Sequence, residues 1–479
     1  MLPTLTSLAL SRMAGVQATA APVSRIRGFD LSCFAARIVW MILAAAITYS
    51  LLWTIGKDEE FQSADFGAYY RAGRAIAGGH SPYVASKDAE QAASGYASAY
   101  AYLLRRQGSP NEVAGDTFVY APAYAYLFWP LSQLDYVTSA RLWMLLNWGA
   151  TLVCVWLGLL LVVGPGRPVP WGLLLLALLP AAGFFWANIR TGQVGTIMLA
   201  CCLAWAACAR HGKPFLGGLL LAAGCALKLS PVLLVPYLAI RRDVRGLAGV
   251  FAGAILLFLI PAPWTGFTGS VHLHLDWLRH MGATQVPIQT YRPMNQSCLG
   301  LLARLPWVSN GGTCWSLENL HMLERWYPIV PLALAIALYA WIVRNRRRAS
   351  DEGRGDQERE RRDNVHLALL LALMTVLHPR AWVFNFVALF PMCLIVSQCV
   401  WERRPRWATA LAALAFVLFT SCLSWSTPYD REWSLSVWLL QGKFFWQALV
   451  LAAVCWWSRF PERASQAITP SNSANLFPV

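Results

Sequence analysis

Long apolar stretches alternate with short polar links along most of the 479-residue chain. A bilayer core about 30 Å thick needs roughly 20 apolar residues in a helix, and stretches of about that length recur from residue 36 to residue 457. The pattern indicates an all-α polytopic membrane protein. It predicts spans at 36–55, 141–163, 170–188, 194–209, 246–263, 323–343, 364–378, 382–400, 406–424 and 434–457.

Prolines interrupt two further apolar stretches. The stretch 215–240 carries Lys228, Pro231 and Pro236, which favours two short segments forming a hairpin over one straight helix. The stretch 117–134 contains two prolines as well, and either spans the membrane or re-enters it. The total prediction is eleven to thirteen membrane segments.

Basic residues cluster in the short links between apolar stretches, and they orient the chain. The net charge is +15, and positive residues stay on the cytoplasmic side of a membrane. The distribution predicts cytoplasmic tails at 1–35 and 458–479, a charged cytoplasmic loop at 344–363, and a transmembrane domain over 36–457. Two large loops, 56–116 and 264–322, then face outward. Because topology accounts for the basic excess, binding of nucleic acid is not expected.

Composition agrees with this placement in a membrane. Apolar residues make up 57% of the chain and charged residues only 13%, which excludes an ordinary soluble globule. Most of the twelve cysteines lie within apolar runs, but Cys298 and Cys314 share the outer loop 264–322. Because the outer compartment permits disulfides, we expect these two to pair. No cysteine or histidine spacing typical of a zinc site occurs.

A polar island follows the first apolar stretch, with the sequence Asp65-Phe-Gly-Ala-Tyr-Tyr-Arg-Ala-Gly73. At helical spacing Asp65 lies one turn from Tyr69, and Tyr70 lies one turn from Arg74. The segment predicts an amphipathic helix on the membrane surface. Asp65 either caps this helix, as aspartate often does, or supplies a carboxylate for chemistry on a polar molecule.

Two further polar features lie between apolar segments. The link Asn188-Ile-Arg-Thr-Gly-Gln-Val-Gly195 contains Arg190 and Gln193, which suit hydroxyls or phosphate oxygens, although it also fits an ordinary polar turn. Lys228 is flanked by long apolar runs. A lysine there is costly and is a functional candidate, unless its ammonium group reaches the interface.

The last polar feature is His378-Pro-Arg-Ala-Trp-Val-Phe-Asn385, which separates two predicted spans. The planar fork of Arg380 suits a phosphate, and His378 suits proton transfer or a substrate hydrogen bond. A tight polar turn anchored by Trp382 is the alternative. Asn295-Gln-Ser297 adds a weaker polar cluster.

Taken in order, these pieces resemble the polyprenol-phosphate-sugar-dependent glycosyltransferases of family 87, the DUF2029 type. This family includes bacterial α-1,2-mannosyltransferases that elongate phosphatidylinositol mannosides. The resemblance covers roughly residues 36–400. Members of the family often carry the pattern Ser-Pro-x-Ser-Trp-x-His-His. At the corresponding position, residues 378–385 of this chain contain an arginine and lack the histidine pair. The matching pieces are the Asp65 island with Pro82-Tyr83, Phe118-Val-Tyr-Ala-Pro122, Asn188 to Val194, Ala226-Leu-Lys-Leu-Ser-Pro231 and Asn295-Gln-Ser297.

The resemblance implies a GT-C fold in a bacterial plasma membrane, with the active site at the outer face and a catalytic carboxylate in the first outer loop. On this match Asp65 is the general base of an inverting transfer. A hexose, with mannose the first expectation, moves from a polyprenyl-phosphate-sugar to a hydroxyl of a glycolipid or glycan.

The donor's leaving group is already an anionic phosphate, so one base and cationic stabilisation suffice. Candidate phosphate contacts are Lys228, Arg190 and Arg380. The other candidate substrate contacts are Tyr69, Tyr70, Gln193, His378 and Asn385. Neither a nucleotide-sugar donor nor an essential metal or other cofactor is expected.

A transporter or flippase of a lipid-linked sugar is the alternative function. Many helices, spans broken by prolines and a lysine within an apolar stretch also suit a transporter. Two features favour the enzyme instead. The halves of the chain show no internal relationship, and key polar residues lie in a long outer loop rather than only at the membrane midplane.

Overall fold

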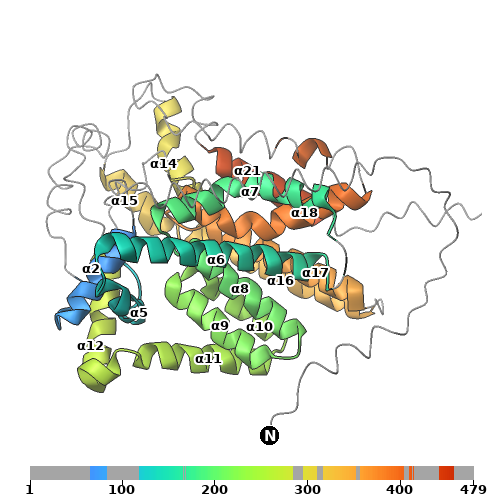
Figure 1. Ribbon diagram of the computed structural model, residues 1–479. Helices are drawn as coiled ribbons and strands as arrows, with labels where there is room; N and C mark the ends of the chain where they lie inside the picture. Colours follow the sequence, from blue (N-terminus) through green and yellow to red (C-terminus); the bar gives the residue numbers. More distant parts are fainter. Residues whose placement is uncertain are drawn as a thin grey trace, which may run out of the picture. The chain divides into compact units, whose positions relative to one another are not determined.

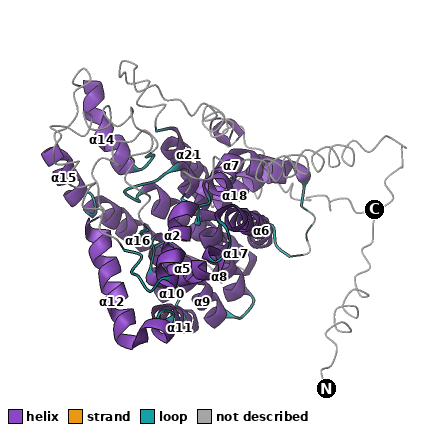
Figure 2. Ribbon diagram, turned by 60° about the vertical axis from the view of Figure 1, so that its left-hand side comes forward, coloured by secondary structure: helices purple, strands orange, loops and turns teal. Residues whose placement is uncertain are grey.

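The computed structural model describes residues 65–83, 118–165, 167, 169–283, 295–309, 317–351, 356–403, 409–412, 414 and 442–457. All the regular structure in these ranges is helical, which confirms the predicted fold class (Figures 1 and 2). The elements are α2 (Phe66–Ala77), α5 (Pro122–Ser132), α6 (Tyr136–Val162), α7 (Trp171–Thr191), α8 (Gly195–Arg210), α9 (Pro214–Leu227), η3 (Ser230–Leu234), α10 (Val235–Ile240), α11 (Val244–Leu259), α12 (Ala262–Ala283), α14 (Cys298–Ser309), α15 (Leu317–Trp326), α16 (Ile329–Asp351), α17 (Asp356–Val376), η4 (Val383–Leu389), α18 (Phe390–Arg403) and α21 (Lys443–Trp457).

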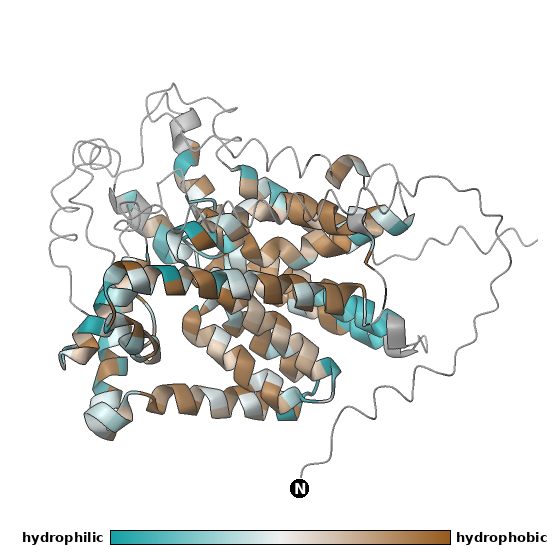
Figure 3. Cartoon of the chain, in the orientation of Figure 1, coloured by the Kyte–Doolittle hydropathy of each residue, from teal (hydrophilic) through white to brown (hydrophobic). Residues whose placement is uncertain are grey.

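Four helices in the described part of the chain are long and apolar enough to cross a membrane, which makes this a multi-pass membrane protein. In Figure 3 the hydrophobic colour follows the middle of the long helices and the hydrophilic colour gathers at their ends. The predicted spans 36–55 and, for the most part, 406–424 lie outside the described residues, so the count of eleven to thirteen stays a prediction. The four helices are Tyr136–Val162, Gly172–Thr191, Met322–Arg347 and Val383–Glu402.

Several predicted segments are shorter than a full span. Gly195–Arg210, Pro214–Leu227 and Ser230–Ile240 are apolar helices below the length that a bilayer requires. The predicted break in 215–240 is confirmed, because α9 ends at Leu227 and η3 begins at Ser230. Lys228 occupies the break in an extended conformation.

Glycines let α9 lie very close to its neighbour α11. A Cβ on Gly218 would come within 2.1 Å of the Gly246 carbonyl oxygen, and one on Gly249 within 2.1 Å of the Phe215 carbonyl oxygen. Small residues permit such backbone approach between membrane helices. Helix α8 also packs against α9, so α8, α9 and α11 form one packed group (Figure 1).

The predicted span 246–263 is a bent pair instead of a straight helix. α11 ends at Leu259, and the following helix turns by 103°. Gly266, within α12, has a positive φ of 71°, a conformation that glycine adopts without steric cost.

The charged segment 344–363, predicted as a cytoplasmic link between two spans, contains helical structure. α16 continues to Asp351 and α17 begins at Asp356, so most of the segment is helical. Arginine and glutamate are good helix formers, and charges of both signs at helical spacing support a solvated helix. The segment still connects two predicted spans, and its cytoplasmic placement stays a prediction.

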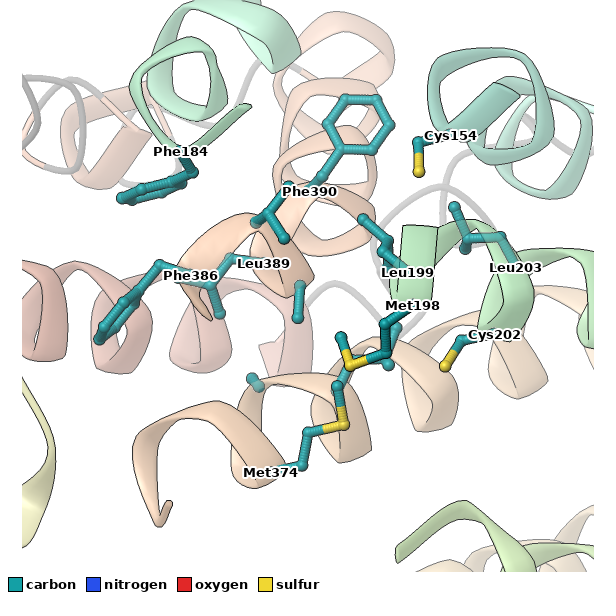
Figure 4. Close-up of a cluster of buried hydrophobic side chains, with 14 of the residues drawn as sticks. Cys154, Phe184, Met198, Leu199, Cys202, Leu203, Met374, Phe386, Leu389 and Phe390 are labelled. Carbon is teal, nitrogen blue, oxygen red and sulfur yellow. The ribbon is translucent and has the colours of Figure 1, made fainter. Parts of the chain in front are cut away.

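A tightly packed core lies where α7, α8, α17, η4 and α18 meet. Figure 4 shows Phe184, Phe386 and Phe390 on one side of this core, with Met198 and Met374 on the other. The rings of Phe184 and Phe386 are 5.8 Å apart, and those of Phe185 and Phe390 are 5.3 Å apart.

Candidate active site

Asp65 stands at the first turn of α2, but its side chain does not cap the helix. The residue has helical dihedral angles, and no side-chain cap hydrogen bond forms. Instead its Oδ2 accepts a hydrogen bond from the Nε2 amide of Gln193, which lies 128 residues further along the chain. This geometry favours the functional interpretation of Asp65 over the capping interpretation.

A sharp turn between α7 and α8 brings Gln193 to Asp65. Gly192 ends α7 in the left-handed conformation, with a φ of 69°. Its carbonyl oxygen accepts a hydrogen bond of 2.6 Å from the indole nitrogen of Trp143 on α6. A Cβ at Gly192 would lie only 2.8 Å from the Cβ of Phe66. The turn therefore packs directly against the start of α2, where Asp65 lies.

Tyrosine hydroxyls extend this polar network. The hydroxyls of Tyr69 and Tyr120 are 2.8 Å apart, and the Tyr120 hydroxyl donates to Oε1 of Gln193 at 3.5 Å. The hydroxyl of Tyr83 donates to the Tyr120 carbonyl oxygen at 2.7 Å. Burial raises the pKa of Tyr69 and of Tyr120, and the charge of Asp65 raises both further. Both hydroxyls therefore stay protonated and able to donate.

Residues of η4 hold Lys228 in the site. Its Nζ donates to Oδ1 of Asn385, 157 residues away, and lies 5.6 Å from the ring centre of Phe384. Burial lowers the pKa of Lys228 to about 8, while the charge of Asp65 acts in the opposite direction. The carboxylate and the ammonium group thus influence one another across the site.

The link 377–382 supplies the remaining polar groups. The backbone N–H of Arg380 donates to Nδ1 of His378 at 3.1 Å, and the Asn385 amide donates to the Arg380 carbonyl oxygen at 2.9 Å. Burial, with Lys228 as the next cause, lowers the pKa of His378 to about 3. The imidazole is therefore neutral near pH 7. The charge of Glu324 partly compensates that of Arg380.

Asn295-Gln-Ser297 holds this link in place. The Asn295 amide donates to the Pro379 carbonyl oxygen at 3.0 Å, and its Oδ1 accepts from the Ala381 N–H at 3.0 Å. The Ser297 hydroxyl donates to the same Pro379 oxygen at 3.0 Å, and the Gln296 N–H donates to the Ala381 oxygen at 2.7 Å. A motif that seemed weak in sequence therefore fixes the backbone beside His378 and Arg380.

A small cavity opens beside Lys228. Met198, Ser230, Met374, Thr375, His378 and Asn385 line it together with Lys228. Figure 4 shows the two methionine side chains extending toward one another from α8 and α17. The ammonium group thus lines a cavity that combines an apolar floor with hydroxyl, amide and imidazole groups.

The other sequence candidates lie elsewhere. Arg190 is in the last turn of α7 and is exposed. The Tyr70 hydroxyl donates to the Leu134 carbonyl oxygen at 2.8 Å, so this residue anchors α2 to the link before α6. Cys314 is outside the described residues, and its pairing with Cys298 stays a prediction. Tyr120, which contacts both Tyr69 and Gln193, lies in the motif Phe118-Val-Tyr-Ala-Pro122, for which the sequence predicted no individual site residue.

The fold and the site together place the protein in a class: helical multi-pass membrane proteins that hold a carboxylate and an ammonium group in one polar site. The chain belongs to glycosyltransferase family 87, whose model matches residues 118–356. The matched range includes Tyr120, Gln193 and Lys228, whereas Asp65 and the link 377–382 lie outside it.

Two curated relatives are polyprenol-phosphate-mannose-dependent alpha-(1-2)-phosphatidylinositol mannoside mannosyltransferases. The one from Mycolicibacterium smegmatis is 26% identical over 272 residues, which are 56% of each chain. The one from Mycobacterium tuberculosis is 25% identical over 365 residues, 71% of this chain and 74% of the relative. The match therefore spans little more than half the length of the first relative. No solved structure matches this chain.

Proposed function

We propose that this protein transfers a mannosyl group from a polyprenyl-phosphate-mannose donor to a hydroxyl of a glycolipid at the outer face of the membrane. Family membership and the two relatives support the reaction class and the donor. The observation that carries the proposal is the orientation of Asp65 by Gln193 in a site that also contains Lys228.

Asp65 is the proposed general base. In the reaction, the acceptor oxygen bonds to the anomeric carbon of the sugar while the bond from that carbon to the phosphate oxygen breaks. The acceptor proton passes to the Asp65 carboxylate, and the polyprenyl phosphate leaves as an anion. A single in-line displacement inverts the anomeric centre, so that a β-linked donor yields an α-linked product. General-base assistance of this kind is typically worth about 10² to 10⁴ in rate.

Lys228 is the proposed contact of the donor phosphate. Its ammonium group lines the cavity and is aimed by Asn385. A fixed positive charge beside the leaving oxygen stabilises the negative charge that develops there. The two arginine candidates suit this role less well. The negative charge of Glu324 partly compensates the positive charge of Arg380, and the Arg190 side chain is exposed.

The amides and tyrosines act as positioning residues in this proposal. Gln193 donates to Asp65 and accepts from Tyr120, so its amide fixes the direction of the carboxylate. Tyr69 holds the Tyr120 hydroxyl, and Asn385 holds Lys228. His378 is neutral and supplies a hydrogen-bonding wall of the cavity rather than a charge.

The proposed orientation of the protein in the membrane rests on the positions of its basic residues. The candidate site is at the N-terminal end of α8 and the C-terminal end of α17, whereas Arg210, Arg346 and Arg359 lie toward the opposite ends of α8, α16 and α17. The positive-inside rule assigns those basic ends to the cytoplasm. The carboxylate and the ammonium group then lie toward the outer face, where a lipid-linked donor is presented.

The test uses the full-length protein in detergent, with radiolabelled polyprenyl-phosphate-mannose as donor. A native membrane lipid extract and a phosphatidylinositol mannoside are the two acceptors. We expect wild type to form a labelled lipid and Asp65→Asn to lose about 10² to 10⁴ in rate. Asp276→Asn is the matched control, because it removes a half-exposed carboxylate on α12 whose ion pair with Arg279, at 3.2 Å, is an i,i+3 contact on the helix surface.

Full transfer by Asp65→Asn would contradict the assignment of the base. An absence of transfer from mannosyl, arabinosyl and glucosyl donors by wild type would contradict the enzyme class, and flux assays in liposomes would then test the transporter function.

A further inference from the structure

A second polar cluster lies at the other ends of the helices that form the candidate active site. Arg210 ends α8, Arg241 follows α10, and Arg346 and Asp363 lie on α16 and α17. The thirteen helical steps from Asp363 to Val376 span about 20 Å of α17 at 1.5 Å per step. The cluster is therefore distinct from the active site.

Asp363 is the centre of the cluster and is already well satisfied. Its Oδ1 accepts from the Tyr237 hydroxyl at 2.8 Å and from Arg346 Nη1 at 2.9 Å. Its Oδ2 lies 3.5 Å from Arg241 Nη2. One carboxylate thus pairs with two guanidinium groups, and the distance from Asp363 to Arg241 is longer than that of a good hydrogen bond.

Arg210 adds a third positive charge, and neutral oxygens accept its hydrogen bonds. It donates to the Leu161 carbonyl oxygen at 2.7 Å, to Oδ1 of Asn364, and to the Glu360 backbone oxygen at 3.4 Å. The carboxylates whose charges act on it are those of Glu360 and Asp363. Three guanidinium groups therefore share two carboxylates, which leaves an excess of positive charge.

Arg210, Arg241 and Asp363 from this cluster line a pocket. Trp205, Arg210, Tyr237, Arg241, Asp363 and Asn364 line it. The side chains of Arg241 and Arg346 are 25% and 30% exposed, so an anion from outside can reach them. A planar guanidinium group matches phosphate oxygens through two parallel hydrogen bonds, and basic pockets between membrane helices bind anionic head groups.

We propose that this pocket binds a phosphate group, carried either by the head group of an anionic lipid or by a soluble phosphate. Arg241 is the main contact, because it lines the pocket and its pair with Asp363 is longer than that of Arg346. Arg346 does not line the pocket itself, but it adds positive charge beside the pocket through its pair with Asp363. The pocket lies among helix ends rich in arginine, which are the ends that meet a membrane surface. This site does not depend on the proposed transfer reaction.

The experiment measures binding through thermal stability, since a ligand that binds only the folded state raises the Tm. Full-length protein in a neutral detergent is titrated with dioleoylphosphatidylglycerol, with dioleoylphosphatidylcholine, or with sodium phosphate. Intrinsic tryptophan fluorescence reports unfolding. Arg241→Gln and Arg346→Gln are compared with Arg344→Gln, which removes the same charge from an exposed position on α16.

We expect phosphatidylglycerol to raise the Tm of wild type and Arg344→Gln, and phosphatidylcholine to leave it unchanged. The apparent affinity of each of the other two variants falls about fivefold, the value of roughly one arginine near an anionic surface. If sodium phosphate also raises the Tm of wild type, a soluble phosphate is sufficient to occupy the pocket. If only phosphatidylglycerol raises the Tm, the ligand is the lipid head group.

Two results overturn the proposal. One is the absence of any Tm response of wild type to phosphatidylglycerol and to sodium phosphate. The other is an equal response of Arg241→Gln and Arg344→Gln. If Arg346→Gln does not fold, Arg241→Gln decides, because its longer and partly exposed pair contributes less to stability.

Discussion

At the scale of single residues, two amide side chains organise the charged groups of the candidate site. An amide donates and accepts at once. Gln193 donates to Asp65 while it accepts from Tyr120, and Asn385 accepts from Lys228 while it donates to the Arg380 carbonyl oxygen. Each amide therefore fixes the direction of a charge without neutralising it.

The proposed role of Lys228 predicts an upper limit on the pH of activity. Its pKa is about 8, below the ordinary 10.5, because burial disfavours the ammonium form. We expect the transfer rate to fall as the pH rises through about 8, since the neutral amine no longer stabilises the leaving phosphate. A kcat/KM profile from about pH 6 to about pH 9.5 brackets this titration and measures the falling limb. A flat profile would contradict the role.

The stability contributed by Lys228 changes in the direction opposite to activity as the pH rises above about 8. Between pH 8 and 10.5 the unfolded chain keeps the Lys228 proton that the folded chain has lost. Raising the pH there therefore increases the contribution of this residue to the free energy of unfolding. A loss of activity above about pH 8 without a fall in Tm separates titration of the site from unfolding.

At the scale of elements, the turn between α7 and α8 determines where Asp65 and Gln193 meet. Gly192 combines a positive φ with close contact to Phe66, and Trp143 holds its carbonyl oxygen. Asn188 ties the same end of α7 to η4 by donating to the Phe384 carbonyl oxygen at 2.7 Å. The turn thus connects both halves of the site.

Two glycine variants separate backbone strain from displacement of the site. Gly212 has a φ of 71° with nothing near its missing Cβ, whereas a Cβ at Gly192 meets Phe66. Each change to alanine costs about 1–2 kcal/mol of stability in the left-handed conformation. We expect Gly212→Ala to keep its transfer activity. Gly192→Ala is expected to lose transfer activity and to lose more stability than Gly212→Ala. The transfer rate measures the first effect and the Tm measures the second. Equal activity of the two variants would show that the contact with Phe66 does not position Asp65.

At the scale of the whole molecule, opposite ends of the same helices carry different chemistry. One end holds the carboxylate, the ammonium group and the tyrosines, and the other holds the arginines around Asp363. The proposed site meets the charge of the donor phosphate with a lysine. In the described part of the chain, no three histidine, cysteine, aspartate or glutamate side chains gather as metal ligands.

We propose that transfer needs no divalent metal. Activity in excess EDTA is expected to equal that in buffer alone, because in the proposed mechanism Lys228 supplies the positive charge that stabilises the leaving phosphate. The measurement is the transfer rate after dialysis against EDTA, with magnesium or manganese added back to a parallel sample. A loss in EDTA that either metal restores would contradict this prediction.

Local patterns predicted much of the fold. The long apolar stretches at 141–163, 170–188 and 382–400 correspond to helices long enough to span, and the break at Lys228 follows the prolines nearby. Hydrophobic length and the backbone restrictions of proline and glycine act over a few residues. The charged helices at 344–363 were missed because solvated arginine and glutamate suit a loop as well as a helix.

Reading the residues in order was enough to establish a helical membrane protein, and motifs that resemble a family named Asp65, Gln193 and Lys228 as candidates. Three contacts became visible only in the folded chain: Gln193 meets Asp65 across 128 residues, Asn385 meets Lys228 across 157, and Tyr120 joins the first pair. These contacts depend on how helices pack. Packing is a property of surfaces that the whole chain brings together, whereas hydrophobic length is present in each segment separately.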